Sequence, residues 1–155
     1  MVKDVSLGEI TLRKYERPYD LDERNLFKKI CLSLGLLQPG DSRDVIVDIL
    51  MTLNNSSKKK EKISSEEIRK RVEVIRNEHK LELKGLAESN VRRQLKRLRD
   101  LMIIERQGNY YYLSEFESLG NIFEDKIVKF HIEPSIARIK EYLSELDKEK
   151  EESNI

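Results

Sequence analysis

The chain has 155 residues, of which 38% are hydrophobic and 38% are charged, and its formal net charge is +1. This length suffices for one domain with a sizeable core and additional segments. No apolar run approaches the roughly 20 residues that span a bilayer. The N-terminus has no signal-peptide pattern, and a single cysteine excludes an internal disulfide. We therefore expect a cytoplasmic protein.

The charge is distributed unevenly along the chain. Residues 58–106 carry sixteen Lys or Arg and nine Asp or Glu, a balance of +7. The remainder carries fourteen and twenty, a balance of −6, so the two parts give the net +1. A basic middle would steer a polyanion to one face of the molecule, although Lys/Glu-rich helices also vary in charge by chance.

The first 40 residues are interpreted as an arm followed by one helix. Alternating apolar residues within 1–19 favour either a short strand or a loose arm. Asp20–Glu23 has the pattern of a capping box, and an apolar stripe follows it: Leu26, Phe27, Ile30, Cys31 and Leu34. Because Cys31 lies on this stripe, we expect a buried structural thiol.

Two amphipathic helices are predicted between residues 41 and 77. Asp41 or Ser42 would cap the first, which would end at a loop over 54–57. The second opens at Ser64, with Glu67 completing a capping box. Cations off its apolar stripe could contact phosphates: Arg69, Lys70, Arg71 and Arg76. Lys59 lies in a lysine-rich run that is either a solvated loop or a non-specific phosphate contact.

A third helix, over 88–102, has two chemically different faces. Val91, Leu95, Leu98 and Met102 share one side at helical spacing. The opposite side and its flank carry donors suited to phosphates and base edges: Ser89, Asn90, Arg92, Arg93, Lys96 and Arg97. The linker 78–88 before it contains alternating leucines, which favour an extended stretch or a prolonged second helix, and Ser89 could cap in place of Ala87.

Residues 103–113 are predicted to form two short strands joined at Gln107-Gly108-Asn109, because Gly and Asn tolerate the positive φ of tight turns. Three tyrosines, 110–112, alternate in face along the second strand. Packing of one or two of them on the core is favoured over base stacking.

The string Asn-Val-Arg-Arg-Gln-Leu-Lys-Arg-Leu-Arg-Asp-Leu-Met-Ile-Ile-Glu-Arg-Gln-Gly-Asn-Tyr-Tyr-Tyr-Leu-Ser (90–114) resembles winged helix-turn-helix DNA-binding domains, most closely small archaeal and bacterial transcription regulators. The resemblance covers about 41–115. It implies a mainly α fold with a small β-hairpin, in which helix 88–102 enters the major groove. The hairpin 103–113 would be the wing, with Arg106 contacting DNA. The linker 78–88 is longer than is usual in this family.

After residue 116 the spacing of apolar residues is helical again. Pro134 is expected to interrupt one helix and to begin another. The second helix carries a narrow stripe close to coiled-coil a/d spacing: Ile136, Ile139, Leu143 and Leu146. This stripe would pack either on the helix 21–34 of the same chain or on a second copy, and we favour the homodimer.

The chain is therefore divided into an arm and helix (1–40), a winged-helix domain (41–115) and a C-terminal helical extension (116–155). No Walker loop or nucleophile elbow occurs, and two separated histidines with one cysteine do not make a zinc site. We expect no enzyme, cofactor, metal or small-molecule ligand. The predicted function is a nucleoid-associated, dimeric transcriptional regulator that binds double-stranded DNA. The alternatives are a winged-helix adaptor in transcription, replication or chromosome machinery, and an architectural chromatin protein.

Overall fold

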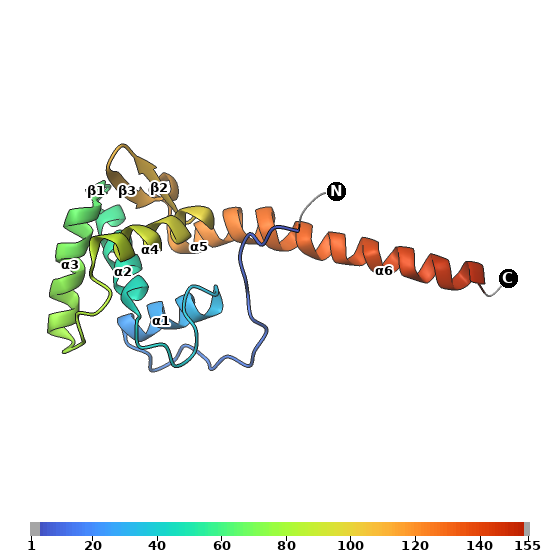
Figure 1. The fold of residues 1–155 in the computed structure, drawn as a ribbon, viewed down its shortest axis with the longest axis horizontal. Coiled ribbons are helices and arrows are strands. Elements are labelled where there is room, and N and C mark those ends of the chain that lie inside the picture. Colours follow the sequence, from blue (N-terminus) through green and yellow to red (C-terminus); the bar gives the residue numbers. More distant parts are fainter. Residues whose placement is uncertain (1–3, 154–155) are drawn as a thin grey trace.

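The computed structural model of the chain describes residues 4–153 (Figure 1). It is mainly helical with one small antiparallel sheet, which confirms the predicted fold class at that level. Within the described part of the chain, no helix is long and apolar enough to cross a membrane.

Helix α1 (Glu23–Ser33) begins two residues later than the predicted capping box Asp20–Glu23 implies, because Asp22 and not Asp20 is its N-cap. The side chain of Asp22 accepts a hydrogen bond from the backbone N–H of Asn25 at 2.8 Å. Phe27 and Cys31 are buried as expected, and burial raises the pKa of the Cys31 thiol to about 12. The N-terminal arm has no helix or strand over 4–17. It passes so close to α1 that a Cβ on Gly35 would lie 2.3 Å from the Glu9 carbonyl oxygen.

Helix α2 (Val45–Lys58) differs at both ends from the prediction. Its N-cap is Asp44 rather than Asp41 or Ser42, and the Asp44 carboxylate bonds to arginines instead of capping the helix. The predicted loop over 54–57 is helical and partly buried. The Ser57 hydroxyl accepts a hydrogen bond from the Leu113 N–H at 3.0 Å, and this bond ties α2 to the sheet. It offsets the low helix propensity of serine at this position.

Strand β1 (Ile63–Ser64) leads directly into α3 (Ser65–Glu78). Ser64 caps α3 through a 3.1 Å bond from the Glu67 N–H, and Ile63 and Ile68 are both buried, as predicted. The Glu67 carboxylate accepts a hydrogen bond from Arg71 at 3.0 Å instead of bonding back to the Ser64 N–H, so only the serine half of the predicted capping box forms.

The linker between α3 and α4 (Glu88–Asp100) is neither extended strand nor prolonged helix. Residues 79–87 have no regular structure, and the chain turns at Gly85 with a φ of 91°. Ala87, not Ser89, is the N-cap of α4, and it makes no side-chain capping bond. Asn90 holds the linker instead, by donating to the Gly85 carbonyl at 2.7 Å.

Strands β2 (Ile104–Gln107) and β3 (Tyr110–Leu113) form the predicted hairpin, and β1 pairs with β3 on its other side, giving the order β1-β3-β2. The turn contains two residues rather than three, because Gln107 already pairs with Tyr110. Gly108 has a φ of 60°, while Asn109 does not have a positive φ, a pattern that fits a type II′ turn.

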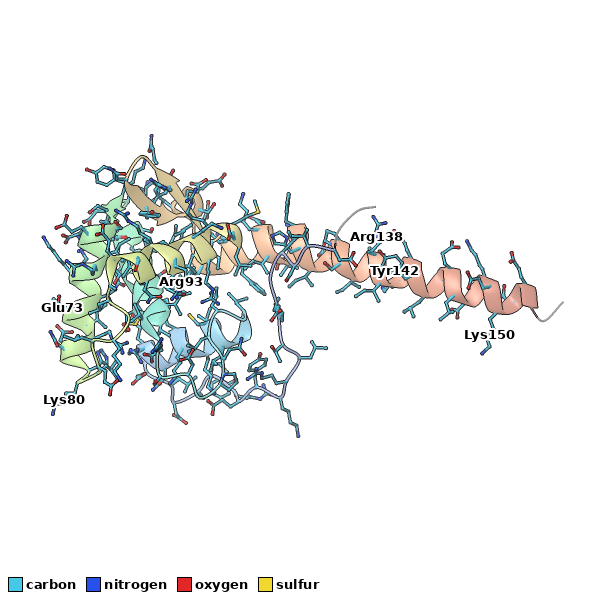
Figure 2. All side chains as sticks on the ribbon, in the orientation of Figure 1. Glu73, Lys80, Arg93, Arg138, Tyr142 and Lys150 are labelled. Carbon is cyan, nitrogen blue, oxygen red and sulfur yellow. The ribbon has the colours of Figure 1, made fainter. Side chains whose placement is uncertain are left out.

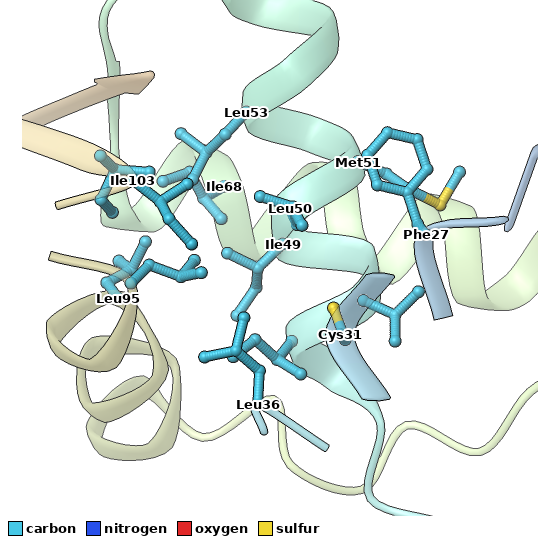
Figure 3. Close-up of a cluster of buried hydrophobic side chains, with 14 of the residues drawn as sticks. Phe27, Cys31, Leu36, Ile49, Leu50, Met51, Leu53, Ile68, Leu95 and Ile103 are labelled. Carbon is cyan, nitrogen blue, oxygen red and sulfur yellow. The ribbon is translucent and has the colours of Figure 1, made fainter. Parts of the chain in front are cut away.

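One core joins α1, α2, α3, α4 and the sheet (Figure 3). Helix α2 lies at its centre and contributes Ile49, Leu50 and Leu53, each fully buried. Leu95 of α4 and Ile103, which follows that helix, meet these side chains in Figure 3. This packing determines which face of α4 is exposed to solvent.

The C-terminal segment does not break at Pro134. A 3-10 turn η1 (Ser114–Phe116) leads to α5 (Leu119–Ile122), and a π-helical stretch η2 (Phe123–Ile132) passes directly into α6 (Glu133–Ser153). Pro134 therefore lies inside a continuous helical segment, directly after the π-helical stretch, and not at a free helix start. The Ser135 hydroxyl donates to the His131 carbonyl at 2.6 Å. Helix α6 projects away from the body of the molecule (Figure 1).

Candidate nucleic-acid interface

Helix α4 has one buried face and one exposed face, as its sequence predicted. Val91, Leu95 and Leu98 are at most 1% exposed and anchor the helix on the core. Ser89, Arg93 and Lys96 of the predicted polar face are exposed, but Arg97 of that face is half-buried. Of the two residues expected on its flank, Asn90 is half-buried and Arg92 is fully exposed.

The four cations among the predicted contact residues of α4 fall into two groups by their partners. Arg92 pairs with Glu88 at 2.7 Å and Lys96 pairs with Asp100 at 3.1 Å, so a carboxylate on the same helix partly neutralises each. These pairs are exposed and contribute little to stability.

The two remaining arginines of this face have only neutral partners. Arg93 donates to the Asn90 side-chain oxygen at 2.6 Å. Arg97 donates to the Gln94 side-chain oxygen at 2.8 Å and to the Gly35 carbonyl at 3.3 Å. Their positive charge is therefore not balanced by an acid of the described chain.

The N-terminal end of α3 lies beside the start of α4. A cavity of about 460 Å³ is lined from one side by Ser65, Glu66 and Arg69 and from the other by Ala87, Glu88 and Val91. The structure therefore brings the predicted contact residue Arg69 to the α4 face. Lys70 is exposed and lies 3.7 Å from Glu66. Lys59 is exposed at the C-cap of α2, outside the residues that line this cavity.

The hairpin is held against the start of β1 by Lys62. The Lys62 ammonium contacts the Gln107 side-chain oxygen and lies 4.8 Å from the centre of the Tyr112 ring, which stacks on Phe116. Tyr111 is buried and Tyr110 is 52% exposed, so one tyrosine packs on the core as expected. Arg106 is exposed on β2, where its side chain bends back to donate to the Gly108 carbonyl at 2.7 Å.

Arg76 was expected among the phosphate contacts, and that interpretation is wrong. Its side chain is 2% exposed and bonds to Asp44 at 3.0 Å, to Asp48 at 2.7 Å and to the linker carbonyl of Glu82 at 2.6 Å. Arg24 of α1 completes this buried ion cluster, with bonds to Asp48 at 2.9 Å and to Asp44 at 3.1 Å. The cluster joins α1, α2, α3 and the linker that precedes α4.

Each charge in the buried ion cluster is compensated by a partner of opposite sign. Burial alone would raise the pKa of Asp44, but hydrogen bonds from Arg76 and Arg24 outweigh it and lower the pKa below its ordinary value. Likewise, burial would lower the pKa of Arg24, but its bonds to Asp48 and Asp44 raise it. One feature of the sequence indicates such a cluster. Asp48 interrupts the apolar run 45–50, and a carboxylate in a buried run requires a cationic partner.

The apolar stripe of α6 is exposed. Ile136, Ile139, Leu143 and Leu146 are between 47% and 60% exposed, and Tyr142 beside them is 67% exposed. Figure 2 shows Arg138, Tyr142 and Lys150 on the part of α6 that extends beyond the body. Packing of this stripe on the helix 21–34, the intramolecular alternative, is therefore not formed in the structure.

Comparison with models of known protein families, with curated proteins and with solved structures finds no match to this chain.

Proposed function

We propose that this chain is a winged-helix protein that binds double-stranded DNA through α4. The element order α2–β1–α3–α4–β2–β3 and the sheet order β1-β3-β2 support the winged-helix assignment, with α4 as reader helix and β2–β3 as wing. The observation that carries the proposal is the exposed basic face of α4, directly opposite the buried Val91, Leu95 and Leu98 and followed at once by the hairpin.

In the proposed complex, α4 lies in the major groove and the flanking elements contact the backbone. Arg93 has a neutral partner, so its guanidinium can pair with a guanine edge without breaking an ion pair. Arg69 and Lys70 of α3, Arg106 of the wing and Lys59 supply phosphate contacts that carry no sequence information.

The proposed biological unit is a homodimer that acts as a transcriptional regulator in the nucleoid. The exposed α6 stripe supports this assembly, since a long projecting helix with unpaired apolar side chains is marginally stable alone. Two reader helices related by a two-fold axis would contact half-sites about one DNA turn apart, roughly 34–36 Å.

A protein-interaction adaptor is the second candidate, and one observation favours it. Arg92 and Lys96 already pair with Glu88 and Asp100, and the net charge of the chain is only +1. A partly neutralised α4 face is suited to a polar protein surface as well as to DNA. An architectural chromatin protein, which would bind DNA with little base preference, is the third.

Selection of duplexes from a random pool, followed by sequencing of the bound fraction, distinguishes these functions. The regulator predicts enrichment of a two-fold symmetric site. An architectural protein would retain duplexes without enriching a sequence, and an adaptor would retain none above a control with Arg93 and Lys96 replaced by Ala.

A further inference from the structure

A polar hollow lies on the flank of α4 that faces the α1–α2 loop. It measures about 460 Å³, which is within the range of about 300–1,000 Å³ typical of ligand sites. Its floor is formed by the buried side chains of Leu36, Val45 and Ile46. Its polar wall carries amides and cations from three segments of the chain: Arg43, Lys84, Asn90, Arg93, Gln94 and Arg97. We call these six residues and this space the basic hollow.

The charges around the basic hollow are strongly unbalanced. Four cations line it, whereas the only carboxylate in its lining is that of Asp41. That carboxylate accepts the backbone N–H of Arg43 at 2.9 Å. Lys84 lies 3.6 Å from Glu82, and both side chains are more than 70% exposed, so this ion pair is weak.

The arginines of the basic hollow have no carboxylate partner within the described chain. Arg93 and Arg97 donate to amide and backbone oxygens, and the Arg43 guanidinium makes no hydrogen bond or ion pair with another described residue. This contrasts with Arg92 and Lys96, which face away from the hollow and are both paired.

Gathering unpaired guanidinium groups around one cavity costs electrostatic repulsion that an anion would relieve. Guanidinium groups match phosphate oxygens with two parallel N–H donors, and the amides of Asn90 and Gln94 add neutral donors beside them. The apolar floor would exclude water from one side of such a ligand and so strengthen its charge-assisted hydrogen bonds.

We propose that the basic hollow is a phosphate-binding site, with Arg43 and Lys84 as its determinants outside α4. The shared chemistry is a phosphate group, which can come from the DNA backbone or from a free phosphorylated small molecule. Phosphate binding would follow from the charge and shape of the basic hollow, and it does not require α4 to read DNA bases.

The test is a titration of inorganic pyrophosphate into the ¹⁵N-labelled full chain, followed by amide chemical shifts. We expect saturable shifts confined to 36–46 and 84–97. The double variant Arg43→Ala/Lys84→Ala should bind about tenfold more weakly, because it loses charge-assisted contacts to the anion. Both residues are exposed, so the variant should keep its fold. The control Lys129→Ala/Lys148→Ala removes the same charge from distant helices and should bind like the wild type.

A second experiment, a competition between pyrophosphate and a DNA duplex, identifies the source of the phosphate. If a DNA duplex shifts the same amides and pyrophosphate competes with it, the hollow binds a backbone phosphate. If pyrophosphate binds equally well to the free and the DNA-bound protein, or binds while no duplex does, the hollow serves a free ligand.

The absence of saturable shifts in the wild type, or equal affinity of the double variant and the wild type, would overturn the proposal. A failure of duplex binding alone would instead remove the proposed function and leave the phosphate site standing.

Discussion

Asp48 is the fully buried carboxylate around which the ion cluster is built. Its two oxygens accept from Arg24 of α1 and from Arg76 of α3, and Arg76 in turn holds the linker carbonyl of Glu82. Periodicity placed Arg76 off the apolar stripe of α3 and so assigned it to solvent. A sequence cannot show that two charges from distant elements neutralise each other, and only that neutralisation allows Arg76 to be buried.

Replacing Arg76 by Leu should destabilise the protein by about 3–5 kcal/mol, because it leaves buried carboxylates with one cationic partner instead of two. Urea unfolding followed by circular dichroism measures the change. The control Arg69→Leu, on the same helix but half-buried and without an ion pair in the described chain, should stay within about 0.5 kcal/mol. Equal stability of the two variants would show that the cluster does not stabilise the fold.

The lowered pKa of Asp44 predicts the acid sensitivity of the same cluster. In the unfolded chain an Asp titrates near about 3.9, and its folded pKa lies below that value. Asp44 therefore contributes stability that is fully present above about pH 4 and is lost as the pH falls through its lower folded pKa. Urea unfolding at a series of pH values should show a shallower acid-induced loss for Asp44→Asn than for the wild type.

Two comparisons make the Asp44 measurement specific. The exposed Asp147→Asn, on α6, should keep the wild-type acid profile. An Asp44→Asn protein whose stability falls with acid as steeply as that of the wild type would contradict the assignment.

The elements with strong local signals were predicted well. The Ser64 cap, the two faces of α4 and the glycine turn each depend on neighbouring residues, and each appears in the structure. Two of the misplaced boundaries depend on distant contacts. The segment 54–57 stays helical because Ser57 bonds to β3, and Asp44 rather than Asp41 begins α2 because arginines from two other helices hold it.

The β2–β3 hairpin, the proposed wing, should make a measurable contribution to DNA binding that does not depend on the base sequence. Arg106 is exposed, donates to the Gly108 carbonyl of its own turn and lies 5.9 Å from the centre of the Tyr111 ring, so it can move to a phosphate without breaking an ion pair. The salt dependence of duplex binding is the slope of log affinity against log salt concentration. Arg106→Ala should make this slope shallower by about one unit. Fluorescence anisotropy at several salt concentrations measures this slope.

The control for the hairpin is Arg138→Ala, which removes one charge from the part of α6 that extends beyond the body (Figure 2). Its slope should equal that of the wild type. A slope unchanged in Arg106→Ala would show that the hairpin does not contact DNA.

The body of the protein and α6 differ in how their apolar surface is covered. The body buries its core between helices and sheet, whereas α6 leaves its stripe in solvent. We predict that the full chain is a dimer at tens of micromolar. The variant Ile139→Asp/Leu143→Asp should be a monomer, because aspartates from both helices would meet in the seam and could not be buried there. Sedimentation equilibrium measures the state.

The dimer prediction has a matched control on the same helix. Glu141→Lys lies between the two seam positions on the opposite side of α6 and should remain dimeric. If the wild-type chain sediments as a monomer at these concentrations, the stripe does not join two copies and the dimer should be abandoned.

Whether α4 binds DNA is decided by one salt titration of duplex binding with the full chain and with Arg93→Ala/Lys96→Ala. We expect a steep loss of wild-type affinity with salt, and for the variant at least tenfold weaker binding at low salt with a slope reduced by about one to two units. Coinciding wild-type and variant curves, or a wild-type chain that binds no duplex even at low salt, would show that α4 is not a DNA-binding helix.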